Sequence, residues 1–264
     1  MPDHRSHRGP HPEDHELFAA ATVPRLCQAT RDLSWLLTRG YAIPSSLKLV
    51  GDRYQLVARQ RLAVARSACG DDQRQRRGRH QQADEALRGE CLAIDGFNVI
   101  TSVEAALSQG VLLQGRDGCI RDMASMHGSY KRVEETVPAI ELIGQWLAGR
   151  GVGRCTWWLD QPVSNSGRLK TILRDVAAQQ GWDWEVKLVA DPDPLLCQET
   201  AVVASSDSQI LDQAVRWVNL ARAVIEARVP EVWRIELGEG AKEGNPKTKL
   251  RPNTSAQSAH LKWR

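Results

Sequence analysis

Three short apolar segments in the second half of this chain each end at an aspartate. The aspartates are Asp95, Asp160 and Asp207, and each segment has the length and composition of a buried strand. If the segments are parallel strands, their carboxyl ends meet at one edge of a sheet, where open α/β folds place their sites. Carboxylates gathered there repel one another unless a cation neutralises them. The pattern therefore predicts a site for a divalent metal, Mg²⁺ or Mn²⁺.

Strand and helix patterns alternate from residue 90 to residue 237, which is typical of an α/β domain. Apolar runs predict strands at 91–94, 155–159, 184–189, 201–204 and 232–237. Amphipathic patterns predict helices at 101–109, 133–147, 165–180 and 208–228. Asp117-Gly118, between two apolar runs, predicts a β-hairpin. We therefore expect a parallel sheet with right-handed crossovers, flanked by helices.

A small all-α module is expected before the α/β domain. Between residues 16 and 69, apolar side chains recur at steps of three and four, which is the period of an amphipathic helix. The segment 70–89 is polar and basic, and it predicts a linker between the two modules. Residues 1–15 and 238–264 lack the apolar content of a core, so we expect a disordered N-terminus and a flexible basic tail.

Charge and cysteine content narrow the class of protein. The formal charge is +3, made up of +4 over residues 1–90, −4 over 91–235 and +3 over the rest. An acidic middle between basic ends fits a metal site flanked by surfaces for a polyanion, and chance variation is the alternative. Six cysteines without a Cys-x-x-Cys pair support neither a zinc knuckle nor a redox motif. Several cysteines lie inside apolar runs, and reduced thiols in a cytoplasmic protein are the simplest account of them. No run of 18 apolar residues occurs, so we expect no membrane span.

Each strand-end aspartate also has a purely structural interpretation. An aspartate before glycine, as in Asp95-Gly96, is a common turn former, and Asp207 could cap the helix that follows it. Three acids at three strand ends together favour a site over three unrelated turns. Metal ions held there would activate a water molecule and neutralise the charge that develops on a phosphodiester.

Longer motifs resemble a known family. Asp95-Gly96-Phe97-Asn98 resembles the Asp-x-x-Asn opening of PIN-like domains, particularly their NYN branch. Further stretches resemble an uncharacterised prokaryotic family that joins a helical domain of unknown function to a PIN-like domain, at residues 31–41, 49–54, 121–132, 159–168 and 205–208. The resemblance implies a Rossmann-like, PIN-type fold and suggests metal-dependent ribonuclease activity.

Carried over residue by residue, the resemblance makes the three strand-end aspartates the metal ligands. Glu104, on the helix after the first strand, would supply a further catalytic acid. Many relatives carry a second aspartate two residues after the late one, where this chain has Gln209. Asp212 lies one helical turn further on and could substitute for it. The departure leaves a one-metal site or a degenerate site as alternatives to a two-metal site.

Two segments are candidates for binding the substrate. Ser164, Asn165, Ser166 and Arg168 open a helix whose free N–H groups could seat a phosphate, and an ordinary helix start is the alternative. Lys131 and Arg132 could hold the scissile phosphate, with Tyr130 stacking on a base and His127 moving protons. The expected orienting groups for ligands or water are Asn98 and Ser206.

We therefore expect a metal-dependent nuclease acting on RNA rather than DNA. The rivals are a non-catalytic nucleic-acid-binding module on a degenerate fold and a small-molecule phosphoesterase. The chain lacks both a Gly-x-Gly-x-x-Gly motif after a strand and a P-loop, which disfavours nucleotide-cofactor enzymes. The partner of the helical module is not indicated, and a homo-oligomer stays open.

Overall fold

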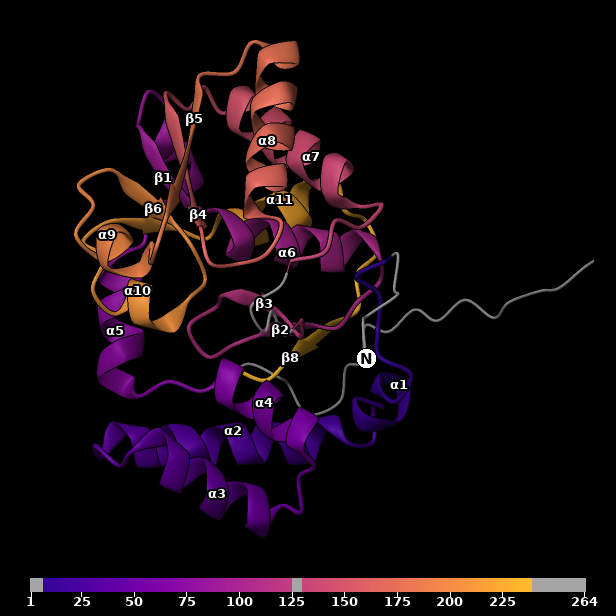
Figure 1. The fold of residues 1–264 in the computed structure, drawn as a ribbon. Helices are drawn as coiled ribbons and strands as arrows, with labels where there is room; N and C mark the ends of the chain where they lie inside the picture. Colours follow the sequence, from indigo (N-terminus) through magenta and orange to yellow (C-terminus); the bar gives the residue numbers. More distant parts are fainter. Residues whose placement is uncertain (1–6, 125–129, 239–264) are drawn as a thin grey trace, which may run out of the picture.

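The computed structural model describes residues 7–124 and 130–238. A five-stranded parallel sheet lies at the centre of its α/β part (Figure 1). The strands lie in the order β5 (Trp184–Val189), β4 (Cys155–Asp160), β1 (Leu92–Asp95), β6 (Val202–Ala204) and β7 (Trp217–Val218). All pairings between these strands are parallel. The expected α/β class, with a parallel sheet flanked by helices, is therefore confirmed.

Helices cover both faces of this sheet because successive side chains of a strand point to opposite faces. Leu92 and Ile94 of β1 pack in the large core. The helices of that core are α6 (Gly96–Leu107), α7 (Thr136–Gly149), α8 (Ser166–Gln180) and α11 (Leu220–Arg228). Ala93 packs on the other face, against residues of α9 (Asp193–Cys197) and α10 (Ser208–Leu211).

Within the described residues, no helix has the length and apolar character needed to cross a membrane.

A second sheet lies between the parallel sheet and the N-terminal helices (Figure 1). Its strands lie in the order β3 (Ile120–Asp122), β2 (Leu112–Gln114) and β8 (Arg234–Glu236). β2 and β3 form the expected antiparallel hairpin. β8, the last strand expected from the sequence, pairs with β2 rather than with the five-stranded sheet.

The N-terminal helical module is confirmed, and it shares a hydrophobic core with the second sheet. Its first four helices are α1 (Asp14–Leu17), α2 (Val23–Thr38), α3 (Ile43–Arg53) and α4 (Ala58–Ser67). Leu33 of α2 and Val64 of α4 belong to one cluster of buried side chains with Leu113 of β2 and Ile235 of β8. The helical module therefore buries its apolar face against strands from the α/β part of the chain.

The segment 70–89, expected to be a linker, instead forms helix α5 (Asp71–His80) and the short 3₁₀ helix η1 (Asp84–Leu87). Aspartates in the first turn of α5 and basic residues in its last turn complement the helix dipole. Arg77 of α5 is almost completely buried, with 1% of its surface exposed. The segment is therefore not a linker, because one of its charged side chains is packed inside the protein.

Two further expectations differ from the structure. The helix expected over 208–228 is divided into α10 and α11 by β7, because Trp217 is fully buried and pairs with Val203 of β6. Residues 7–15 were expected to be disordered, yet Asp14 is buried and pairs with Arg59 of α4. Residues 239–264, most of the expected tail, lie outside the described residues.

The shared core predicts that both modules unfold together. Leu113→Ala removes a fully buried side chain between α2, α4 and the second sheet. The free energy of unfolding should fall by about 2–5 kcal/mol, in a single transition. Urea unfolding followed by tryptophan fluorescence and far-ultraviolet circular dichroism measures both quantities.

Leu49→Ala is the matched control, because Leu49 of α3 is 62% exposed. It should change stability by no more than about 0.5 kcal/mol. Two separate transitions in the wild-type protein would contradict the shared core.

Candidate active site

The three strand-end aspartates lie at the carboxyl edge of the parallel sheet. Asp95 and Asp160 are the last residues of β1 and β4, and Asp207 follows β6 by three residues. The chain runs from β1 outward to β4 and β5, then returns to the other side of β1 with β6 and β7. The switch point of the strand order is therefore between β1 and β6, where open α/β sheets form their sites. Asp95 and Asp207 flank this point.

Asp95 is the most deeply placed of these acids, with 7% of its surface exposed. Burial raises the pKa of its carboxyl to about 7, and the charges of Asp207 and Asp193 add to the effect. The hydroxyl of Ser205 donates a hydrogen bond to Asp95 Oδ2 at 2.7 Å and partly offsets burial. The same hydroxyl accepts the N–H of Asp207 at 3.0 Å. Ser205 thus connects the two acids on either side of the switch point.

Asp193 is a fourth acid at this edge, and it was not predicted from the sequence. It is the first residue of α9, which follows β5. Its pKa is raised to about 6 by burial and by the charges of Asp207, Asp191 and Asp160. Burial and Asp191 likewise raise the pKa of Asp160. We call Asp95, Asp160, Asp193 and Asp207 the acid edge. The available signal was Asp191-Pro192-Asp193-Pro194, directly after a predicted strand.

The acid edge has the donor chemistry of a Mg²⁺ or Mn²⁺ site, because its candidate ligands are carboxylate oxygens, and a cation would lower the raised pKa values of Asp95 and Asp193. In the part of the chain that the structure describes, no three Asp, Glu, His or Cys side chains are grouped closely enough to hold an ion.

Asp207 accepts the N–H of Gln209 at 2.7 Å and so caps α10. Its capping role, foreseen as the structural alternative, is therefore real.

The two predicted orienting residues bond to each other across the switch point. Asn98 Oδ1, in the first turn of α6, accepts the N–H of Ser206 at 2.9 Å and its hydroxyl at 3.0 Å. These bonds join the Asp95–Asn98 turn to the turn that carries Asp207. Asn98 and Ser206 therefore help to hold the two acids at a fixed separation.

Glu104 and Asp212 are bonded elsewhere. Glu104 is fully buried, forms an ion pair with Arg8 at 2.8 Å, and accepts the hydroxyls of Tyr130 and Thr136. Asp212 accepts hydrogen bonds from Gln73 and Arg77 of α5. Tyr130 is 1% exposed, so its expected role in stacking on a base is wrong. His127 lies outside the described residues.

The two predicted phosphate-binding segments lie side by side. The side chain of Asn165 donates to the carbonyl of Tyr130 at 2.7 Å, and the N–H of Tyr130 donates to the carbonyl of Ser164 at 3.2 Å. Lys131, Arg132 and Arg168 are exposed next to these contacts, while Ser166 is buried. The backbone N–H of Ser166 is bonded to Val163, so it is not free for a phosphate. The structure thus brings three exposed cations to neighbouring turns.

Lys187 adds a cation that the sequence did not single out. Asp95, Trp158 and Lys187 are partners in register across β1, β4 and β5. A carboxylate, an indole and an ammonium therefore stand in one row on the same face of the sheet. Lys187 Nζ lies 4.8 Å from the centre of a Trp158 ring. The sequence pattern gave no signal for Lys187, because this residue lies inside a predicted strand and not at its end.

Residues 84–223 match the model of a domain of unknown function, DUF5616. The chain belongs to the DUF5616 family. Residues 25–80 match a second family of unknown function, DUF434. An uncharacterised protein of Methanocaldococcus jannaschii, MJ0935, is 30% identical over 184 residues, which cover 70% of this chain and 88% of that protein. No solved structure matches the chain. The expected uncharacterised two-domain family is thus confirmed, and these relatives bring no assigned activity.

The raised pKa of Asp95 predicts an unusual pH dependence in metal-free protein. Its carboxyl binds a proton more tightly in the folded state, at a pKa of about 7, than in the unfolded chain, where the ordinary value is 3.8. Its contribution to stability is therefore complete below pH 4 and is lost as the pH rises through 7. Since one pKa unit corresponds to about 1.4 kcal/mol, the loss is on the order of 4 kcal/mol.

Asp95→Asn should remove this dependence, because the amide does not titrate. Chemical unfolding in chelator from pH 4 to pH 8 should show the variant gaining stability relative to wild type as the pH rises. Parallel pH profiles for the two proteins would contradict the prediction.

Proposed function

We propose that this protein is a Mg²⁺- or Mn²⁺-dependent nuclease that cleaves RNA, built on a PIN-like domain. The observation that supports the proposal most strongly is the acid edge, where four aspartates lie at the carboxyl edge of a parallel sheet and burial raises the pKa values of Asp95 and Asp193. Carboxyl groups with perturbed pKa values are enriched at functional sites, and a bound cation would relieve the repulsion between them. The Asp-x-x-Asn sequence at the turn from β1 into α6 is the feature that favours the PIN-like assignment.

In this proposal Asp95, Asp160 and Asp207 hold the metal, and Asp193 assists them. The bound ion would activate water and neutralise charge on the phosphodiester. Ser205 keeps the carboxylate of Asp95 directed toward the switch point through its 2.7 Å hydrogen bond.

The exposed cations complete the proposed site. Lys131, Arg132 and Arg168 would bind backbone phosphates of the substrate, because they are exposed on adjoining turns. Glu104 contributes indirectly, since its bonds to Tyr130 and Arg8 secure the residue before Lys131. RNA is favoured over DNA by the resemblance of the motifs to ribonucleases.

A second function, RNA binding without cleavage, is favoured by one observation. The carboxylate of Asp207 is used to cap α10, and position 209 is an exposed glutamine where many relatives carry an acid. If Asp207 keeps its capping bond in solution, fewer oxygens are available to an ion.

Asp95→Asn separates the two functions. In the nuclease, the variant should lose at least about 100-fold in Mn²⁺-dependent cleavage of a single-stranded RNA, because a direct metal ligand is removed, while RNA binding persists. Cleavage is followed on denaturing gels with labelled RNA and matched DNA, and binding by fluorescence anisotropy.

Asp183→Asn is the control, because this carboxylate is exposed and precedes β5 at the opposite edge of the sheet. It should cleave like the wild type. Wild-type protein that binds RNA without metal-dependent cleavage would favour the non-catalytic function. Hydrolysis of a simple phosphomonoester with RNA left intact would favour a phosphoesterase.

A further inference from the structure

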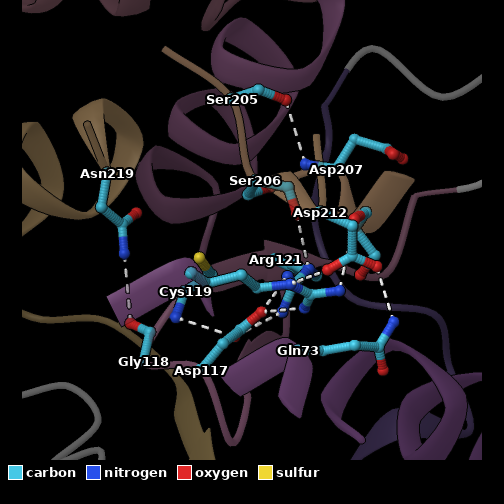
Figure 2. A network of polar contacts seen from close by, with 12 residues as sticks. Gln73, Asp117, Gly118, Cys119, Arg121, Ser205, Ser206, Asp207, Asp212 and Asn219 are labelled. Atoms are coloured by element: carbon cyan, nitrogen blue, oxygen red, sulfur yellow. Dashed lines mark hydrogen bonds and ion pairs between the residues drawn. The ribbon is translucent and has the colours of Figure 1, made fainter. Parts of the chain in front are cut away.

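A buried network of charges is attached to the turn that carries Asp207 (Figure 2). Arg121 of β3 is 8% exposed, and its Nε donates to the carbonyl of Ser206 at 2.8 Å. Its two terminal nitrogens donate to the carboxylate of Asp117 at 3.0 and 2.6 Å. The β2–β3 hairpin is therefore bonded to the residue immediately before Asp207.

Arg77 reaches the same network from helix α5. Its guanidinium donates to Asp117 Oδ2 at 2.6 Å, to Asp212 Oδ1 at 2.7 Å and to the carbonyl of Ser208 at 3.2 Å. Gln73, one turn earlier in α5, donates to Asp212 Oδ2 at 2.6 Å. Both ends of α10 are thus held by side chains of α5.

The buried carboxylate of Asp117, at the centre of this network, keeps its negative charge. Burial alone would raise the pKa of Asp117, but the guanidinium groups of Arg121 and Arg77 outweigh burial and hold that pKa well below its usual range. The carboxylate therefore stays ionised and accepts bonds from both arginines. A guanidinium offers its N–H groups in a rigid fork, so these bonds set directions as well as distances.

We propose that Arg77 and Arg121 are positioning residues, through which helix α5 of the N-terminal module sets the place of Asp207 at the acid edge. The inference rests on the proposed function, because it gives the helical module a role in the same site. The DUF434 match ends at residue 80, so α5 belongs to that module. The bonded carbonyls belong to Ser206 and Ser208, the two neighbours of Asp207.

The arrangement also accounts for Asp212. This carboxylate lies one turn beyond Asp207, but it accepts bonds from Arg77 and Gln73 instead of facing the other acids. Its charge balances the second guanidinium of a network that contains two arginines and two aspartates. In this proposal Asp212 serves the acid edge by anchoring α10.

Arg121→Lys in the full-length protein tests the role, because lysine keeps the charge and loses the fork. Amide hydrogen exchange should become at least about 10-fold faster at residues 206–212. Mn²⁺ affinity, measured by calorimetry, should weaken by about 10-fold or more, as is typical when groups supporting a metal ligand are removed. The kcat for RNA cleavage should fall while KM changes less than about twofold. Arg77→Lys should act in the same direction.

Arg59→Lys is the matched control. Arg59 also pairs with a buried aspartate, Asp14, but within the helical module and away from the acid edge. The control should lower the melting temperature without changing exchange at 206–212 or Mn²⁺ affinity.

The outcomes separate the inference from the function on which it rests. Unchanged exchange at 206–212 in Arg121→Lys, with a melting temperature lowered as in the control, overturns the positioning role. If Arg121→Lys does not fold, Arg77→Lys decides by the same criterion. Wild-type protein that neither binds Mn²⁺ nor cleaves RNA overturns the proposed function, and the exchange measurement then decides the positioning role by itself.

Discussion

The carboxylate of Asp117, held between Arg77 and Arg121, connects helix α5, the β2–β3 hairpin and the turn that follows β6. The arginines come from α5 and β3, and through them Asp117 is linked to the turn between β6 and α10. Buried charges are tolerated only with complete partners, and removing one partner of such a pair typically costs about 3–5 kcal/mol. The hairpin, α5 and the end of β6 must therefore be in place together. The network contributes to the orientation of these elements more than to net stability, because the free-energy cost of removing the charges from water offsets much of their attraction.

The acid edge has the opposite electrostatic character. Among the residues that the structure describes, the carboxylates of Asp95 and Asp193 lack guanidinium partners, and burial together with their neighbours' charges raises their pKa values to about 7 and about 6. The pKa of Asp117 is thus lowered by its arginine partners, whereas the pKa values of Asp95 and Asp193 are raised by their surroundings. Asp117 holds the elements around it in place through its two arginines. A bound cation would stabilise the charged forms of Asp95 and Asp193.

Local patterns were sufficient for much of the fold. β1, β4, β5 and β6 were foreseen because apolar runs and turn residues are adjacent in the sequence, and Asp117-Gly118 marked the hairpin. Helix α5 was not foreseen, because its residues are polar and Arg77 finds its partners 40 and 135 residues away. The division between α10 and α11 was missed for the same reason, since Trp217 is ordered by pairing with β6 and by burial in a distant core.

The sequence by itself determined that each of three strands ends in an aspartate or is closely followed by one, and that a parallel sheet would bring these acids to one edge, because strand period and turn chemistry are local properties. It also determined that a helical module precedes them. Only the tertiary structure decided that Asp193 joins the acid edge, that Asp212 accepts a hydrogen bond from Arg77, and that α5 contacts both ends of α10. These outcomes depend on which charges are buried together, and burial is a property of the folded chain as a whole.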